Sequence, residues 1–270
     1  MSLSSFISMY ALTPCHVGSG SSVGVVDNPI QRERHTNWPV IPSSGMKGAM
    51  REQFSRSANT LTTDEIFGSS NSGGSEHSGA IVISDGKILA FPMRSSIAPF
   101  VWITCPGVLK RLNKDLAWLG KSTIEIPNIQ GDQAKSLIGS LTGQILLEDT
   151  IVQAEKCNSN LEMYFPNVER LLLVSDEVFH YGVSHCTAIN AQIRIKSKTG
   201  TTDDGSLRYT EELPADTLMY SIIVCHNSRK QSDNSLKSDK IQTMLKNEFS
   251  YTQVGGDMTL GRGIFQLTWQ

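Results

Sequence analysis

The order of extended and helical runs along the chain constrains its fold more than any other feature. An apolar run at residues 6–13 stops at Pro14, as a first strand would. Apolar residues spaced three or four apart predict helices within residues 39–54, 104–120 and 235–249, with extended runs between them. This order of strand, helix, strands, helix, strands, helix and strand favours an α+β domain with a ferredoxin-like or RNA-recognition-type core.

One pair of extended runs predicts a long hairpin. Apolar and polar side chains alternate through INAQIRIKSK, a turn-rich tip follows, and SLRYTEEL is extended again. We expect this hairpin over roughly residues 189–213, with a basic polar face. A hairpin-type turn is also predicted at Asp85-Gly86, between two short extended runs. The whole chain, residues 1–270, is expected to be a single domain with insertions at roughly residues 57–100 and 120–165.

Composition excludes several classes of protein. Charged residues make up 19% of the 270 residues and the net charge is −2, so the chain is neither disordered nor strongly basic, and any phosphate-binding surface must be local. The five cysteines form no CxxC pair, which argues for reduced thiols and against a disulfide framework. The N-terminus lacks the basic region of a signal peptide, and no apolar run is long enough to span a bilayer. We therefore expect a cytoplasmic protein with no membrane partner.

A glycine-rich stretch near the C-terminus, VGGDMTLGRG, is a candidate phosphate-binding loop. Glycines let the backbone approach a polyanion closely and point N–H groups at phosphates. The stretch is not a nucleotide P-loop, because no GK[ST] follows and a strand rather than a helix comes next. A glycine-rich hairpin turn explains the same residues equally well. The candidate residues are Gly255, Gly256, Gly261, Arg262 and Gly263.

The start of the first helix, PSSGMKGAMRE, is a second candidate anion site. Free amides and the helix dipole favour negative charge at a helix N-terminus, and Ser43 or Ser44 can cap those amides. Lys47 and Arg51 lie one turn apart on one face of this helix. The alternative is a capped helix with a solvated basic face.

A single carboxylate, Asp27, stands in the loop VGSGSSVGVVDNP, shortly before Arg32, Arg34 and His35. In one interpretation the loop is a solvated turn, with Asp27 an Asx-type residue before Asn28-Pro29. In the other, Asp27 acts on an anion that the arginines hold. The local sequence leaves both open.

Six runs, taken together and in order, resemble the backbone subunits of type III-B CRISPR effector complexes (the family of the fourth subunit of the Cmr complex), within the RAMP superfamily. The resemblance extends from near residue 10 to the C-terminus. The runs are PVIPSSGMKGAMRE, IFGSS, RSSIAPFVWITCPGVLKRL, LLLVSDEVF, DDGSLRYTEELPADTLMY and VGGDMTLGRG.

The resemblance implies a fold, a set of partners and an activity. Such subunits have an RNA-recognition-type (RAMP) palm with inserted loops and a β-hairpin thumb, and they stack as further copies of themselves along a guide CRISPR RNA beside other CRISPR effector subunits. The thumb enters the duplex of guide and complementary target RNA, and the complex cleaves the target at regular intervals. Cleavage depends on a divalent metal ion, magnesium or manganese, which implies a metal-dependent endoribonuclease.

The resemblance also assigns roles to residues. Asp27 lies in the loop that matches the family's cleavage loop, so it is the expected catalytic residue and the expected metal ligand. Weaker candidates beside it are His16, Tyr209 and Glu211. Guide-RNA contacts are expected from residues that offer amides or positive charge, namely Arg32, Arg34, Ser43, Ser44, Lys47, Arg51, Gly255, Gly256, Gly261, Arg262 and Gly263.

Three hypotheses of function follow from the sequence. The first is an RNA-binding backbone subunit that cleaves target RNA through Asp27. The second is a structural subunit of the same filament in which Asp27 is inert. The third is an independent enzyme that binds a phosphorylated small molecule at its glycine-rich loop.

Overall fold

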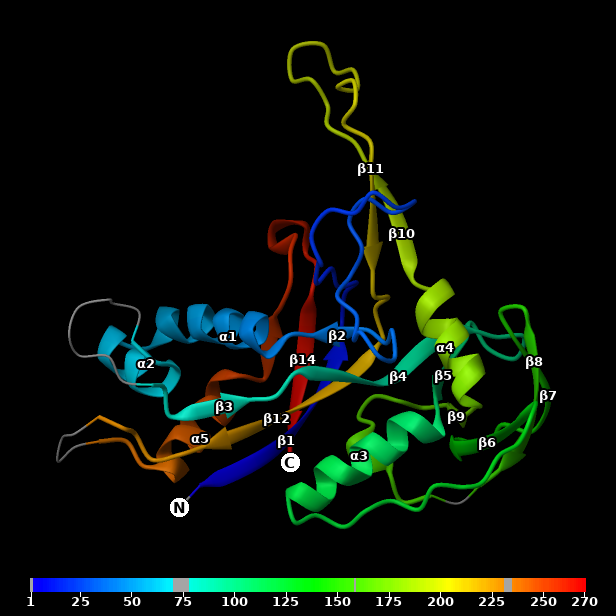
Figure 1. Cartoon of the computed structure of the whole chain (residues 1–270), viewed down its shortest axis with the longest axis horizontal. Helices are drawn as coiled ribbons and strands as arrows, with labels where there is room; N and C mark the ends of the chain where they lie inside the picture. Colours follow the sequence, from blue (N-terminus) through cyan, green and yellow to red (C-terminus); the bar gives the residue numbers. More distant parts are fainter. Residues whose placement is uncertain (1, 70–77, 158, 231–234) are drawn as a thin grey trace.

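The computed structural model describes residues 2–69, 78–157, 159–230 and 235–270. Its palm is an antiparallel sheet in the order β14–β1–β12–β4, with α1 (Ser43–Ser57) between β1 and β4 and α5 (Ser238–Glu248) between β12 and β14 in the chain (Figure 1). A β-α-β-β-α-β chain that places its last strand beside its first, and its third strand between the first and the second, has the ferredoxin-like arrangement. The expected α+β palm is therefore confirmed. The strands of the palm are β1 (Leu3–Ala11), β4 (Gly86–Arg94), β12 (Leu218–Cys225) and β14 (Ile264–Trp269).

The palm sheet is buried on both faces, which explains why β1 reads as a nearly continuous apolar run. Met46 and Met50 of α1 (Ser43–Ser57) meet Ile7 and Met9 around a small void on one face. On the other face Phe6 stacks on Tyr220, with ring centroids 5.2 Å apart, and α3 (Pro106–Trp118) covers them. Side chains that alternate between two covered faces must be apolar on both.

Beyond β4 the sheet continues through strands that the helices α3 and α4 (Asp176–His185) cover. The range 57–100, expected as an insertion, includes β4 at the centre of the sheet, and the range 120–165 supplies the strands of its far edge. The remaining strands are β2 (Val40–Ile41), β3 (Ile81–Ile83), β5 (Phe100–Thr104), β6 (Gln133–Ile138), β7 (Gly143–Leu147), β8 (Thr150–Lys156), β9 (Leu171–Leu173) and β13 (Tyr251–Gln253). The remaining helices are α2 (Thr60–Phe67), α5 (Ser238–Glu248) and the short η1 (Glu162–Tyr164) and η2 (Met258–Leu260).

The expected hairpin turn at Asp85-Gly86 is wrong. Both β3 and β4 pair antiparallel with β12, so the chain keeps its direction through these residues and only shifts register. The Asp85 side chain instead accepts a hydrogen bond from the Ser43 amide, at 2.8 Å. The expected serine cap of α1 is also wrong. The cap position is Pro42, and the Asp85 carboxylate accepts the hydrogen bond of the first helix amide in place of a serine hydroxyl.

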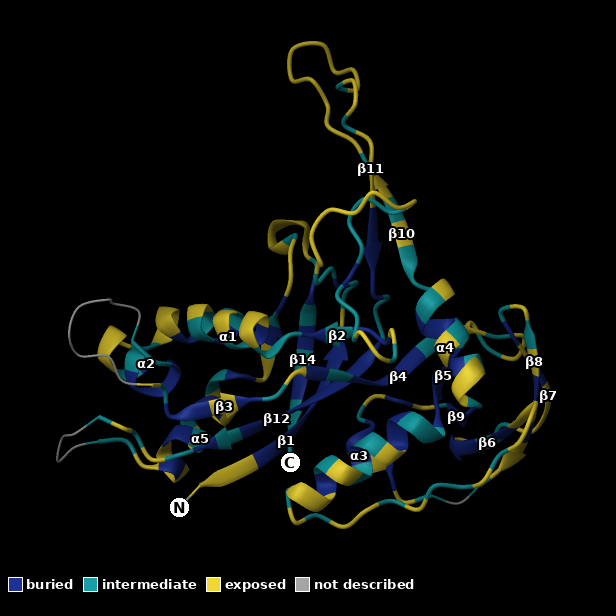
Figure 2. Cartoon of the chain, viewed as in Figure 1, coloured by how far each residue is buried: buried dark blue, intermediate teal, exposed yellow. Residues whose placement is uncertain are grey.

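A two-stranded hairpin stands away from the palm and forms the thumb (Figure 1). Its strands are β10 (Ala188–Gln192) and β11 (Arg208–Glu212), and the tip between them is almost entirely exposed (Figure 2). Only the base of the thumb is buried, at Thr210, Glu211 and Glu212. The base is therefore the part of the hairpin that the palm holds in place.

Within the described residues, no helix combines the length and the apolar character that crossing a membrane requires.

Candidate nucleic-acid interface

Asp27 lies at the base of the thumb. Its neighbour Asn28 forms a parallel bridge with Thr210 of β11. The Asn28 amide donates to the Tyr209 carbonyl, and the Asn28 carbonyl accepts from the Glu211 amide, both at 3.0 Å. The Asp27 Oδ2 atom accepts the Tyr209 amide at 2.7 Å. An Asx turn at Asp27 would need the amide of Pro29, which has none, so the expected Asx role of Asp27 is wrong. The end of the loop instead forms a single bridge to β11 at Asn28, and one carboxylate oxygen of Asp27 is bound to the thumb backbone.

Glu211 is buried at the centre of this junction, whereas an exposed side chain would be expected on a solvated strand. Its carboxylate accepts hydrogen bonds from the Ile30 amide at 3.1 Å, the Thr187 hydroxyl at 2.9 Å and the Arg32 guanidinium at 2.5 Å. Arg32 also donates to the Asn37 carbonyl. The charges of Glu211 and Arg32 are therefore paired with each other inside the fold. This favours a structural role for Glu211 rather than contact with a cleaved phosphate. It likewise favours a structural role for Arg32 rather than contact with RNA.

The fold places His16 and Tyr209 beside the same part of β11 that binds Asp27. The Nδ1 atom of His16 lies 2.7 Å from the Glu211 carbonyl oxygen. Because a carbonyl only accepts, Nδ1 carries the hydrogen, and the neutral ring keeps its lone pair on Nε2. The backbone amide of Tyr209 donates to Asp27, and the Tyr209 side chain is 42% exposed. Arg34 and His35 lie on the exposed turn that follows the loop.

The glycine-rich stretch is a hairpin turn between β13 and β14 that packs on the segment before the Asp27 loop. Gly256 donates its amide to the His16 carbonyl and Gly263 donates to the Pro14 carbonyl, both at 2.8 Å. Gly261 and Arg262 donate to carbonyls within the turn itself. These four amides are already satisfied inside the chain, which argues against phosphate contacts through them, for RNA and for a phosphorylated small molecule alike.

At two glycines of this turn, Gly255 and Gly263, a Cβ would clash with backbone, and the closer clash is at Gly263. The φ of Gly263 is +73°, and a Cβ there would lie 2.0 Å from the Val254 carbonyl oxygen. We expect Gly263→Ala to lower the free energy of unfolding by at least about 2 kcal/mol, from the left-handed backbone and the clash together. Thermal denaturation checks this, with Gly261→Ala as the control, because Gly261 shares the positive φ but faces open space. Equal losses in the two variants would contradict the steric argument.

Arg262 contacts a carboxylate rather than open solvent. Its Nε lies 3.1 Å from the Glu212 Oε1 atom, and the Glu212 side chain is completely buried, with Asn190 bonded to its other oxygen at 2.8 Å. Successive side chains of β11 point to opposite sides, so Glu211 ties the thumb to the Asp27 loop and Glu212 ties it to the glycine-rich turn. Sequence reasoning missed Glu212 and Thr187. For Glu212 a signal was present: two adjacent glutamates on one strand point to opposite sides, so each can form its own ion pair.

The start of α1 keeps one cation accessible. Arg51 is bound to Asp64 and to the Gly68 carbonyl, which favours a structural role in holding α2. Among the described residues, Lys47 reaches only the Ile81 carbonyl, at 3.4 Å, and burial, then the nearby Arg51 charge, lowers its pKa. Ser44 is exposed, whereas the amide of Ser43 is occupied by Asp85. Lys47 is therefore the better candidate of the two cations for an anionic ligand.

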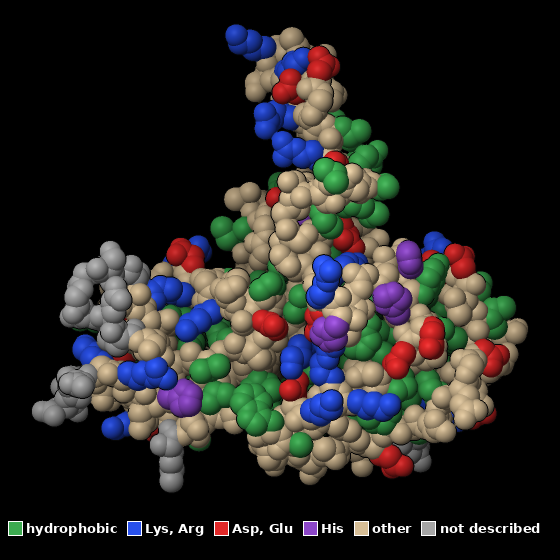
Figure 3. Space-filling model, viewed as in Figure 1, with side chains coloured by type: hydrophobic (Ala, Val, Ile, Leu, Met, Phe, Trp, Pro, Cys, Tyr) green, Lys and Arg blue, Asp and Glu red, His purple; other side chains and the backbone are tan. Residues whose placement is uncertain are grey.

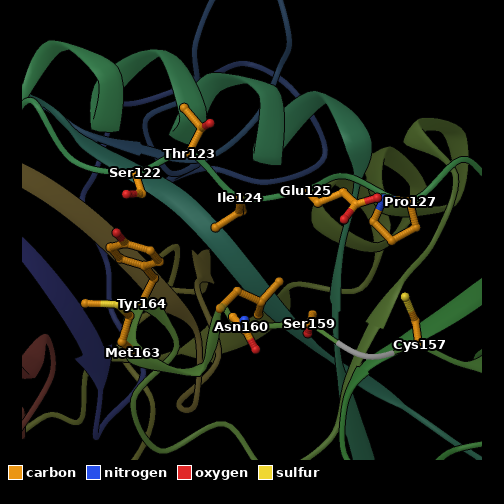
Figure 4. A pocket seen from close by; sticks show the side chains of 11 residues that line it. Ser122, Thr123, Ile124, Glu125, Pro127, Cys157, Ser159, Asn160, Met163 and Tyr164 are labelled. Atoms are coloured by element: carbon orange, nitrogen blue, oxygen red, sulfur yellow. The ribbon is translucent and has the colours of Figure 1, made fainter.

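Basic side chains are visible on the thumb and on the palm face below it (Figure 3). A cavity of about 510 Å³ lies elsewhere, between the segment 122–127 below α3 and the segment 159–164 (Figure 4). None of the candidate residues lines it. The candidate interface is thus the open surface around the thumb base and not an enclosed pocket.

A divalent ion at Asp27 would need ligands from outside the chain. Among the described residues, no three His, Cys, Asp or Glu side chains are grouped so that they could hold a metal. Asp27 uses Oδ2 for the Tyr209 amide and presents Oδ1 as a hard oxygen donor. Magnesium is commonly held by one or two carboxylates together with substrate phosphates and water, so the residues present fit an ion that arrives with a nucleic acid.

The comparisons with known proteins agree on one family. The RAMP superfamily profile matches residues 8–266. The "CRISPR system Cmr endoribonuclease Cmr4" of Pyrococcus furiosus is 34% identical, over 97% of this chain and 94% of the relative. The "CRISPR system CMR subunit Cmr4" of Saccharolobus solfataricus is 23% identical over 96% of this chain and 94% of the relative.

Solved structures share the fold. A cryo-EM structure of the Type III-B Cmr-beta bound to cognate target RNA contains a chain with a TM-score of 0.81 and 22% identity, covering 99% of this chain and 97% of that chain. A crystal structure of oligomeric Cmr4 from Pyrococcus furiosus gives a TM-score of 0.74 at 26% identity, covering 99% of this chain and 98% of that chain. The palm-and-thumb arrangement is therefore common to these proteins.

Proposed function

This chain belongs to the RAMP superfamily and, within it, to the Cmr4 family, and from this premise we propose that it is a backbone subunit of a type III-B CRISPR effector complex. It binds guide CRISPR RNA together with further copies of itself and other effector subunits, and it cleaves complementary target RNA. The name of the Pyrococcus furiosus relative, an endoribonuclease, and the oligomeric crystal form of that organism's protein support this assignment.

The observation that carries the proposal is the fixed position of Asp27 at the thumb base. A hairpin that separates base pairs of a guide–target duplex distorts the target backbone at its own base. There a target 2′ oxygen can align with the adjacent phosphorus and attack it, so that an O2′–P bond forms and the P–O5′ bond breaks. Asp27 accepts the proton of the 2′-hydroxyl or orients that group, and the 5′ oxygen leaves with a proton from water.

A magnesium or manganese ion would be held by the Oδ1 atom of Asp27 together with target phosphate oxygens and water. When bound, such an ion would stabilise negative charge that develops on the phosphate. His16 presents Nε2 as a second proton acceptor near Asp27's loop.

The alternative of an inert Asp27 in a purely structural subunit has one observation in its favour, the hydrogen bond to the Tyr209 amide. Asparagine at position 27 keeps that acceptor and removes the charge. Assembling the complex with Asp27→Asn and offering complementary labelled RNA separates the two functions, because only the catalytic role needs the charge.

Guide binding is expected to depend on charge more than on sequence, since base pairing supplies the specificity. We expect Lys47→Ala to weaken binding of unrelated RNA sequences alike and to flatten the slope of log affinity against log salt by about one unit. Filter binding at several salt concentrations measures both quantities. The matched control is Lys246→Ala, which removes an exposed lysine from α5. An unchanged slope for Lys47→Ala would exclude a phosphate contact at this residue.

A further inference from the structure

We propose that Arg111, on the palm helix α3, is a positioning residue for target cleavage: through Glu33 it holds the segment that carries Asp27. The inference rests on the proposed function and gives a role to a side chain outside the candidate interface. Neither Glu33 nor Arg111 is needed to contact RNA in this account.

The contact between Arg111 and Glu33 is a two-pronged ion pair. The Nη1 atom of Arg111 lies 2.7 Å from Oε1 of Glu33, and Nη2 lies 2.8 Å from Oε2. The two side chains are only 19% and 15% exposed, and Thr36 donates a further hydrogen bond to the carboxylate at 2.5 Å. Parallel hydrogen bonds between planar groups fix orientation as well as distance, so this contact restricts how the Glu33 segment can turn.

An aromatic contact reinforces the ion pair. The Arg111 guanidinium lies over the Trp38 ring, 4.9 Å from its centroid, and Trp38 meets Phe179 of α4 edge-on at 5.4 Å. Gly107 leaves room for this ring, since a Cβ there would lie 3.0 Å from it. A planar guanidinium can stack and bind a carboxylate with both prongs at once, and an ammonium group cannot.

The clamped segment leads directly to Asp27. Arg32 and Pro39 form an antiparallel bridge, and the Glu33 amide donates to the Trp38 carbonyl at 2.9 Å, so the turn between them is a small hairpin. Successive side chains of extended backbone point to opposite sides. Arg32 therefore reaches Glu211 on the thumb while Glu33 reaches α3. The segment after Asp27 is braced between thumb and palm.

Loss of Arg111 leaves the Glu33 carboxylate with little solvent and no guanidinium partner. The segment then has to turn outward to hydrate this charge, and the Asp27 loop follows. Because a displacement of about 1 Å can slow an enzymatic step about a hundredfold, we expect cleavage in Arg111→Ala to fall by roughly ten- to a hundredfold.

The test compares assembled complexes that carry Arg111→Ala, Arg111→Lys or the matched control Lys114→Ala, which removes an exposed charge from the same helix. Single-turnover cleavage at saturating target, target affinity, and deuterium exchange of peptides that contain the Tyr209 amide are measured. In Arg111→Ala we expect the slower cleavage, target affinity within about twofold of wild type, and faster exchange at Tyr209, because RNA contacts lie elsewhere. Arg111→Lys should recover part of the rate, and Lys114→Ala should match wild type.

Unchanged cleavage and unchanged Tyr209 exchange in Arg111→Ala would overturn the inference, as would a loss of rate that only follows the fraction of complex assembled. If Arg111→Ala does not assemble, Glu33→Gln and Arg111→Lys decide the same question with smaller changes. The proposed function fails separately: if Asp27→Asn still cuts the target, catalysis by Asp27 is excluded, while the Tyr209 exchange continues to decide whether Arg111 holds the loop.

Discussion

An assembled complex with Asp27→Asn is expected to bind guide and target RNA normally and to cut the target at least about a hundredfold more slowly. The amide oxygen of asparagine still accepts the Tyr209 N–H, so the loop keeps its place on β11. What is lost is the negative charge that accepts the proton or holds a divalent ion. Single-turnover cleavage of labelled complementary RNA measures this loss.

The control for this variant is binding. Target affinity of the Asp27→Asn complex should equal that of wild type, because the account assigns no ground-state affinity to this side chain. Asp27→Ala removes the Tyr209 acceptor as well and should cut no faster than Asp27→Asn. Wild-type cutting by either variant would leave Asp27 with the structural role alone.

The second large effect is expected in the stability of the thumb base. Arg262→Ala leaves the completely buried Glu212 carboxylate without its cation, and of the residues that the structure describes Asn190 alone remains bonded to it. Removing one partner of a buried pair costs about 3 kcal/mol or more, because the other charge stays buried. A loss of about 3 kcal/mol corresponds to a fall in Tm of roughly 6–12 °C for a chain of this size. Calorimetry of the full chain measures it.

Two further variants separate burial of charge from loss of packing. Adding Glu212→Gln to Arg262→Ala removes the uncompensated charge, so the double variant should recover part of the lost Tm. Arg56→Ala breaks an exposed pair on α1 and should change stability by less than about 1 kcal/mol. An Arg262→Ala chain that melts like wild type but binds guide RNA weakly would instead assign Arg262 to RNA, as the resemblance implied.

Sequence reasoning succeeded where local patterns determine structure. The spacing of Met46, Met50 and Phe54 predicts α1 because all three face one side of a helix, and they are buried there. Alternation through residues 189–196 predicts a strand of the thumb because a pleated strand repeats every two residues, although the regular pairing ends at Gln192. The α+β palm follows from the order of these elements. Each of these features depends on neighbours within a few positions.

The site required contacts that no local pattern contains. Arg32 looked like a free cation, but its partner Glu211 lies 179 residues away. The amides of the glycine-rich turn looked free, but the carbonyls of Pro14 and His16 accept two of them. Helix α1 looked self-capped, but its first amide is bound by Asp85, from the connection between β3 and β4. Whether a charge or amide is available depends on tertiary pairing, which composition and spacing do not specify.

The most direct test of the central claim is the position of the Asp27 carboxylate in a structure of the assembled complex with guide RNA and a target made uncleavable by 2′-deoxy substitution. We expect a carboxylate oxygen within hydrogen-bonding reach of the distorted linkage, about 2.6–3.2 Å from the sugar or phosphate or joined to it through one water or ion. A complex in which the thumb base contacts the duplex while Asp27 faces away from every target ribose and phosphate would contradict it.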